Sequence, residues 1–265
     1  MKSLTAEGSS TFRTRWGTRL ADSHLRRRLR ARPAMQGRLL APAGIFRRLP
    51  TTAGLYFPFY HDIPAHHARE FRDHLLTFRR LGSFVTWEES VAILTGRRSL
   101  PAPTFCLSFD DCHRSWLDVA LPVLRCLDIP ATFFVITGTV GQRGELTWND
   151  CRELAAAGMG IGSHTRSHQR LAALDDSAAI LEIRDSKAEI EDQIGRPVLD
   201  FAAPYGWPDR DYLARDVELA RRAGYRSFAT TARAVMRPGD TPWAIRRQGL
   251  HPAWPMWAVR TRLHE

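Results

Sequence analysis

The sequence contains no run of eighteen or more apolar residues, so no membrane-spanning helix is expected. Its first residues include basic ones, but neither the apolar stretch of a secretory signal nor a twin-arginine pair followed by one. The four cysteines show no paired Cys-x-x-Cys spacing, which fits reduced thiols better than a disulfide framework. From these absences we expect a cytoplasmic protein.

Positive charge is concentrated at one end of the chain. Residues 1–50 hold twelve Lys and Arg against Glu7 and Asp22, whereas the other residues balance at 26 basic and 26 acidic. We predict a basic, flexible arm at 1–50 and one folded domain at 51–265. A solvated arm and peripheral contact with an anionic membrane are both open, because clustered arginines gain from such a surface. No nucleic-acid motif is present, so no nucleic-acid partner is expected.

Strand-like and helix-like segments alternate from Gly54 onward. The expected strands are 55–60, 83–85, 104–109, 131–136, 158–162, 199–203 and 226–229. The expected helices are 65–81, 87–94, 115–127, 147–157, 177–194 and 210–223. Such alternation implies an α/β fold with parallel strands and right-handed crossovers. We therefore predict that about seven units close into a distorted (β/α)7 TIM-like barrel, for which 265 residues suffice.

Two adjacent carboxylates, Asp110 and Asp111, directly follow the apolar strand 104–109. Carboxylates crowded at the end of a buried strand repel each other and lose hydration, so a bound cation is the natural explanation. His164 and His168 stand four residues apart, and one helical turn would bring both rings to one face. Two imidazoles and one carboxylate form the ligand set of a catalytic divalent metal, with zinc as the default. The second carboxylate is then free to act as a base.

The segment 201–206, Phe-Ala-Ala-Pro-Tyr-Gly, has the form of a strand that ends in a fixed turn. Such a turn could aim a backbone N–H and the Tyr205 ring at the same site. In a parallel barrel the loops that follow the strands gather at one face, where catalytic groups lie. His61 follows the strand 55–60, and both a structural role and a role in the site are open for it.

Three motifs, at 108–111, 164–168 and 201–206, resemble in order and spacing those of the NodB-type polysaccharide deacetylases, carbohydrate esterase family 4. The resemblance covers about Gly54 to His251. It implies a metal-dependent hydrolase that removes N-acetyl groups from an amino sugar in a polysaccharide or glycoconjugate. The implied cofactor is Zn²⁺ or another divalent metal.

The resemblance also implies a role for each site residue. The metal ligands would be Asp111, His164 and His168. Asp110 would be the base, and the backbone N–H of Tyr205 would bind the oxyanion. His251, after the apolar Leu250, would be the general acid, with His113 and His61 as other candidates. We expect substrate contacts from His61, Pro204 and Trp207.

Two positions depart from the family pattern. Cys112 stands where the family usually has Gly, and Ala202 stands where an Arg often orients the base, so Asp110 must be held in another way. A branch of the family that acts on β-1,6-linked N-acetylglucosamine polymers also resembles Phe-Ala-x-Pro-Tyr-Gly. Two alternatives stay open: a deformylase or deacetylase of a lipid-linked sugar at the membrane surface, and a non-catalytic carbohydrate-binding barrel.

Overall fold

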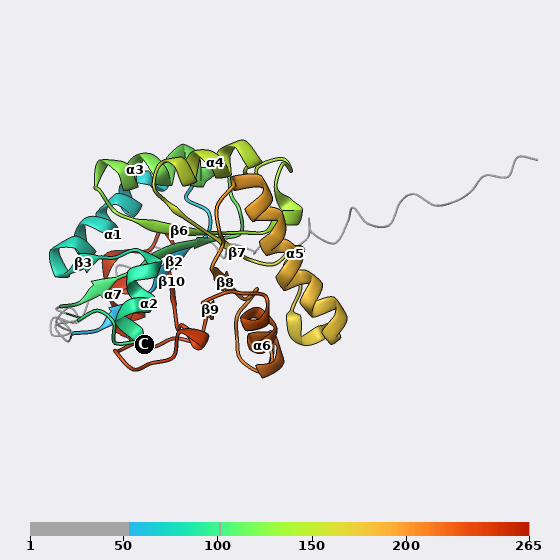
Figure 1. Cartoon of the computed structure of the whole chain (residues 1–265). Coiled ribbons are helices and arrows are strands. Elements are labelled where there is room, and N and C mark those ends of the chain that lie inside the picture. Colours follow the sequence, from blue (N-terminus) through green and yellow to red (C-terminus); the bar gives the residue numbers. More distant parts are fainter. Residues whose placement is uncertain (1–52, 101, 265) are drawn as a thin grey trace, which may run out of the picture. The chain divides into compact units, whose positions relative to one another are not determined.

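The structure is a computed structural model that describes residues 53–100 and 102–264 (Figure 1). The predicted basic arm at residues 1–50 lies outside the described residues. None of the helices in the described part of the chain is long and apolar enough to cross a membrane.

A seven-stranded sheet forms the centre of the domain, and its strands follow the order β10-β2-β5-β6-β7-β8-β9. Every pairing in it is parallel. Its strands are β2 (Pro58–Tyr60), β5 (Leu107–Asp110), β6 (Ala131–Val135), β7 (Gly160–Ser163), β8 (Asp200–Ala202), β9 (Ser227–Ala229) and β10 (Gln248–Gly249). A second, three-stranded sheet contains β1 (Leu55–Tyr56), β4 (Thr104–Phe105) and β3 (Ser83–Phe84).

The segment 245–249 connects the two edges of the seven-stranded sheet. On one side, Ile245 forms a parallel bridge with Ala229 of β9, and the Thr230 N–H donates to the Ile245 carbonyl at 2.8 Å. On the other side, Gln248 of β10 pairs with Pro58 of β2. The sheet therefore curls into the predicted distorted (β/α)7 barrel, and the fold class is confirmed.

Seven α-helices surround this sheet within the described residues (Figure 1). They are α1 (Ala68–Leu81), α2 (Trp87–Leu94), α3 (Leu121–Cys126), α4 (Trp148–Ala156), α5 (Asp176–Ile194), α6 (Ala214–Arg222) and α7 (Met256–His264). Capping boxes begin α2 and α4, where the side chains of Thr86 and Thr147 accept the backbone N–H three residues on. Helix α5 ends at Gly195, which adopts the left-handed conformation at φ 66°.

Alternation along β5 separates the helix-facing core from the barrel interior. Phe109 packs in the layer between sheet and helices, with ring centroids 6.0 Å from Phe71 of α1 and 4.7 Å from Phe133 of β6. Its neighbours Ser108 and Asp110 point the other way and contact the buried Arg247. The last inward residue of β5 is therefore a carboxylate at the carboxyl end of the barrel.

Two expected strands are each divided between the two sheets. The expected strand 55–60 breaks at Phe57, whose N–H donates to the Gln248 side chain at 2.9 Å instead of to a sheet partner. The expected strand 104–109 breaks at Cys106. The sequence pattern missed these breaks because both halves of each strand are apolar and buried.

Two expected helices begin differently from the prediction. The segment 115–127 begins with a π-helical stretch, Trp116–Ala120, before α3. Helix α6 begins at Ala214 and not at Arg210, because 207–211 forms a turn in which the Asp211 N–H donates to the Trp207 carbonyl at 2.9 Å.

Candidate metal centre and catalytic site

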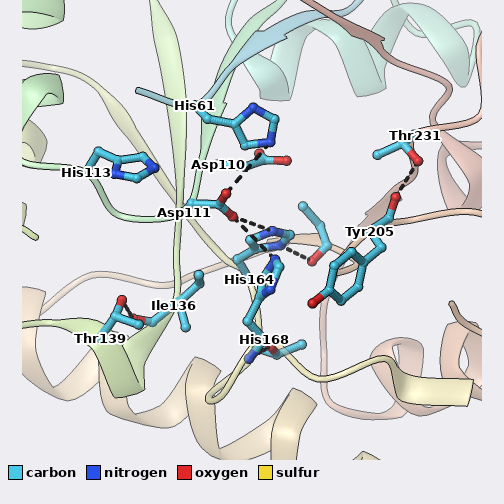
Figure 2. A network of polar contacts seen from close by, with 12 residues as sticks. His61, Asp110, Asp111, His113, Ile136, Thr139, His164, His168, Tyr205 and Thr231 are labelled. Atoms are coloured by element: carbon cyan, nitrogen blue, oxygen red, sulfur yellow. Dashed lines mark hydrogen bonds and ion pairs between the residues drawn. The ribbon is translucent and has the colours of Figure 1, made fainter. Parts of the chain in front are cut away.

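Asp111, His164 and His168 meet at the carboxyl end of the barrel (Figure 2). Asp111 Oδ1 lies 3.4 Å from the Nε2 atom of each imidazole. One ligand atom from each residue can be chosen so that all three lie within 4.8 Å of one another. The structure thus brings together the three residues that the sequence predicted as metal ligands.

The surroundings of the Asp111 carboxylate fit a bound cation. Its Oδ1 atom is buried and has no hydrogen-bond partner within the described residues, although two imidazole nitrogens lie nearby. Burial alone would raise the pKa of Asp111, but His164 and His168 outweigh it and hold that pKa below its usual range. One carboxylate oxygen and two imidazole nitrogens around an unsatisfied oxygen fit a divalent metal such as Zn²⁺.

The turn after β5 aims Asp111 at this centre. Asp111 and Cys112 both have positive φ, at 87° and 66°. The Leu146 N–H donates to the Cys112 carbonyl at 2.9 Å and holds the turn. The Cys112 thiol is fully buried and interacts with the Cys151 thiol, which together with burial raises the pKa of Cys112. Cys112 is not part of the ligand group and fills the position that glycine usually occupies.

His164 and His168 lie in a loop after β7 and not on one helical turn, so this part of the sequence interpretation was wrong. Thr165 and His168 adopt positive φ, at 67° and 57°. The His168 N–H donates to Thr165 Oγ1 at 3.0 Å. His164 is buried, and its Nδ1 lies 2.7 Å from the carbonyl of Ala202 in β8, which leaves Nε2 to face the centre.

Glu182 of α5 stabilises this loop through hydrogen bonds. Its carboxylate accepts hydrogen bonds from the backbone N–H groups of Arg166 and Ser167 at 2.9 and 2.8 Å. It also accepts one from the Ser167 hydroxyl at 2.6 Å. A four-residue spacing of histidines is equally compatible with a helix or a turn, and only the packing of α5 decides between them.

Asp110 is held by Arg247, which the sequence analysis did not identify. Arg247 Nη1 donates to Asp110 Oδ1 at 2.8 Å, and Nη2 donates to Oδ2 at 2.7 Å. Arg247 Nε donates to the Thr230 carbonyl at 3.0 Å, and its guanidinium lies over the Phe59 ring at 4.3 Å. Arg247 therefore orients Asp110, and it does so from a different part of the barrel than position 202, where the family often has an Arg. The departure at Ala202 was the one signal in the sequence that such a residue must exist.

The ionisation of Asp110 depends on this pair. Burial would raise the pKa of Asp110, but the positive charges of Arg247 and His164 outweigh it and lower that pKa. His164 responds in the opposite direction: burial alone would lower its pKa, and Asp110 and Asp111 raise it. Asp110 is thus an ionised carboxylate beside the candidate metal ligands.

Tyr205 lies in a tight turn after β8, and its ring lies next to that of His168 (Figure 2). Its φ is 61°, and its ring centroid lies 4.8 Å from that of His168. The Thr231 hydroxyl donates to the Tyr205 carbonyl, whereas the Tyr205 N–H has no hydrogen-bond partner among the described residues. The next residue, Gly206, has φ 69°, and any larger residue would clash there because its Cβ would lie 2.7 Å from the Thr231 nitrogen. The turn leaves one backbone donor free.

The three residues predicted to contact substrate lie in three different environments. His61 lies at the centre, with Nε2 3.8 Å from Asp111 Oδ2. Pro204 is buried beneath the Tyr205 turn. Trp207 has 44% of its surface exposed beyond that turn.

His251 follows β10 and lies apart from the candidate ligands. The structure gives it no hydrogen bond or ion pair with Asp110 or Asp111 within the described part of the chain. Its ring lies 6.3 Å from that of His67, and its Nδ1 accepts the Ala253 N–H at 3.2 Å. Burial lowers the pKa of His251, and the neighbouring charges of His67 and His61 lower it further.

His113, another candidate general acid, is directed at Glu145. Its Nδ1 lies 3.8 Å from Glu145 Oε2, and backbone groups of the two residues form an antiparallel bridge.

The fold and the site together define a class of protein: a parallel β/α barrel with an Asp-His-His candidate metal centre and a second, arginine-bound carboxylate at the carboxyl ends of its strands. The model of the polysaccharide deacetylase family matches residues 97–228. The solved structure of IcaB from Ammonifex degensii is 30% identical, with a TM-score of 0.68, and the match covers 80% of this chain and 98% of that one. The chain belongs to the polysaccharide deacetylase family.

A curated relative agrees with this assignment, and a further solved structure shares the fold. YxkH of Bacillus subtilis (strain 168), whose name places it among polysaccharide deacetylases, is 25% identical over 199 residues, which cover 73% of this chain and 70% of YxkH. The Streptococcus pyogenes deacetylase PplD, solved in complex with acetate, is 22% identical, with a TM-score of 0.69, and shares the fold over 80% of this chain and 98% of its own. Family membership implies a hydrolase that acts on carbon–nitrogen bonds of an N-acetylated polysaccharide.

Proposed function

We propose that this chain is a metal-dependent hydrolase that removes N-acetyl groups from an amino sugar in a polysaccharide or glycoconjugate. The observation that carries the proposal is the division of two adjacent carboxylates between different partners. Asp111 faces His164 and His168, whereas Asp110 is bound by Arg247. One carboxylate is thus available as a metal ligand and its neighbour as a base.

Asp111, His164 and His168 would hold the metal, with zinc as the default for one oxygen and two nitrogen donors. A divalent metal in this position supplies a lowered pKa for a water molecule and polarises the amide carbonyl. The partly exposed side chains of Asp111 and His168, at 28% and 25%, leave room for water and substrate on that side.

Asp110 would accept the proton of the attacking water. A base must be ionised to do so, and the lowered pKa of Asp110 keeps it ionised in neutral solution. Arg247 occupies one lone pair on each oxygen of Asp110, and each carboxylate oxygen has a second one. The pair therefore fixes the direction of Asp110 without blocking it.

The free N–H of Tyr205 would stabilise the negative charge that develops on the carbonyl oxygen as water adds to the amide carbon. When the carbon–nitrogen bond breaks, the amine needs a proton, which we assign to His251. Its Nδ1 lies 3.2 Å from the Ala253 nitrogen, so Nε2 is the ring atom from which the imidazolium form would give up a proton. The products are acetate and a free amino sugar, with His61, Pro204 and Trp207 as substrate contacts.

The two alternatives differ in their support. The departures at Cys112 and Ala202 favoured a non-catalytic barrel, but Cys112 adopts the left-handed turn and Arg247 holds Asp110. A lipid-linked sugar as substrate depended on the arm at residues 1–50, which lies outside the described residues. Removal of N-acetyl groups from a polysaccharide needs only the described site, and it is the function that this site supports best.

The test is acetate release from β-1,6-linked N-acetylglucosamine oligomers by the purified full-length chain with Zn²⁺. We expect release to stop on chelation and to return with Zn²⁺. Asp110→Asn should abolish release while bound zinc stays the same, and Asp192→Asn, a change of an exposed carboxylate on α5, should leave both unchanged. Release that is insensitive to chelation would contradict metal dependence. A zinc-loaded chain without activity on any N-acetylated oligomer would favour the binding barrel.

A further inference from the structure

The side chains of Arg170 and His168 both contact the Tyr205 ring beside the candidate metal centre, and these three residues are called the Tyr205 cluster. The guanidinium carbon of Arg170 lies 4.4 Å from the centroid of the Tyr205 ring. The ring centroid of His168 lies 4.8 Å from the same Tyr205 ring. Arg170 and a predicted metal ligand thus contact the same aromatic ring. Tyr205 is 47% exposed and the Arg170 side chain is 51% exposed, so solvent reaches the Tyr205 cluster.

Asp211 fixes Arg170 by one nitrogen only. Asp211 is fully buried, and its Oδ1 accepts from Arg170 Nε at 2.8 Å. The other donors to its carboxylate are Arg210 and the Trp207 N–H, at 3.0 to 3.1 Å. Arg170 Nη1 and Nη2 have no hydrogen-bond partner among the described residues. The guanidinium is thus held in place while its two terminal groups remain available.

Arg170 shares its carboxylate partner with a second arginine. Two guanidinium groups, from Arg170 and Arg210, share the single carboxylate of Asp211. The exposed carboxylate of Asp209 in the same turn forms no ion pair with either arginine. The two terminal nitrogens of Arg170 therefore stay unpaired among the described residues, next to the place where substrate would meet Asp111 and His168.

We propose that Arg170 forms an anion-recognition subsite, so that the preferred substrate carries an acidic group beside its N-acetylated sugar. This inference rests on the proposed function of the neighbouring centre. A guanidinium presents two parallel N–H groups that match the two oxygens of a carboxylate or a phosphate. The exposed part of the Tyr205 side chain offers apolar contact to the sugar that bears this group. The shared chemistry is an anionic oxygen pair, from either a uronic acid or a sugar phosphate.

Binding is measured by titration calorimetry on the zinc-loaded, full-length Asp110→Asn chain, which lacks the proposed base and does not consume the ligand. The first pair of ligands is a hyaluronan tetrasaccharide, which contains uronic acid, and the neutral chitin tetrasaccharide. The second pair is N-acetylglucosamine 1-phosphate and N-acetylglucosamine. Because the titration records affinity and acetate release is assayed separately on the unmodified chain, failure of either idea can be recognised independently.

We expect the anionic member of at least one pair to bind about two- to fivefold more tightly, the range for one exposed ion pair. Preference in the first pair indicates a uronic acid, and preference in the second indicates a phosphate. Arg170→Gln should remove the preference, and Arg170→Lys should retain part of it. Arg184→Gln, a change of an exposed arginine on α5, should have no effect. Equal affinities within both pairs, or a preference that survives Arg170→Gln, would overturn the proposal.

Discussion

Arg247 and Asp110 form a bidentate ion pair inside the barrel, with donor–acceptor distances of 2.8 and 2.7 Å. Neither side chain is more than 3% exposed. The two residues are 137 positions apart in the sequence, and Arg247 lies on the segment that connects the two edges of the sheet. The charge and direction of the proposed base therefore depend on how the barrel closes.

We expect Arg247→Lys to lower kcat by on the order of tenfold or more, because an ammonium cannot reproduce the two parallel hydrogen bonds. The pKa of Asp110 should rise, since Arg247 is the largest of the charges that lower it against the effect of burial. Asp110 must be ionised to accept a proton, so the acidic limb of the rate profile should move to higher pH. Measurement of kcat against pH, with bound zinc determined in parallel, checks this.

Arg246→Lys is the matched control, because Arg246 is only half-buried and pairs with Asp240 instead. It should leave the pH profile in place. If Arg247→Lys also left the profile in place, Arg247 would have only a structural role. Complete removal of the charge in Arg247→Met is expected to cost about 3–5 kcal/mol of folding free energy, which makes Lys the more informative change.

Glu182→Gln should weaken zinc binding by roughly tenfold to a hundredfold, the range for a residue that orients metal ligands. Glu182 accepts three hydrogen bonds from Arg166 and Ser167, and a neutral amide cannot accept all of them as strongly. Zinc affinity is measured by competition with a chromophoric chelator. Glu189→Gln, an exposed position on the same helix, should not change it. Equal zinc affinities in both variants would limit Glu182 to a role in stability.

His251→Gln should lower kcat by about a hundredfold or more if His251 protonates the leaving amine. A general acid acts only when protonated, and burial together with His67 lowers the pKa of His251. Activity should therefore fall as the pH rises through a value below the ordinary histidine range. His67→Gln removes one positive neighbour and should move this limb to higher pH. An alkaline limb that stays in place in His67→Gln and persists in His251→Gln would exclude His251 as its source.

The carboxyl ends of the strands could be predicted from the sequence because a local pattern of residues marks each of them. An apolar run followed by Asp110 and Asp111 marks where a buried strand meets polar chemistry. Parallel topology then places His164 and Tyr205 at the same face. Asp111 and His164 followed from these two local rules together with donor chemistry, whereas His168 was predicted from a helical spacing that the loop does not have.

The supporting residues could not be predicted in this way. Arg246 and Arg247 are adjacent and chemically identical in sequence, yet one pairs with Asp240 at the surface and the other lies fully buried against Asp110. Which of them points inward depends on how 245–249 fits between β9 and β2. Glu182 is likewise one of several acidic residues on α5, and only the packing of that helix against the histidine loop distinguishes it.

The position of the closing segment 245–249 has a consequence for how the enzyme is made. During synthesis, every candidate zinc ligand emerges well before Arg247, so a growing chain could capture metal while Asp110 still lacks its counter-ion. Reactivity would then appear only after the final strand docks.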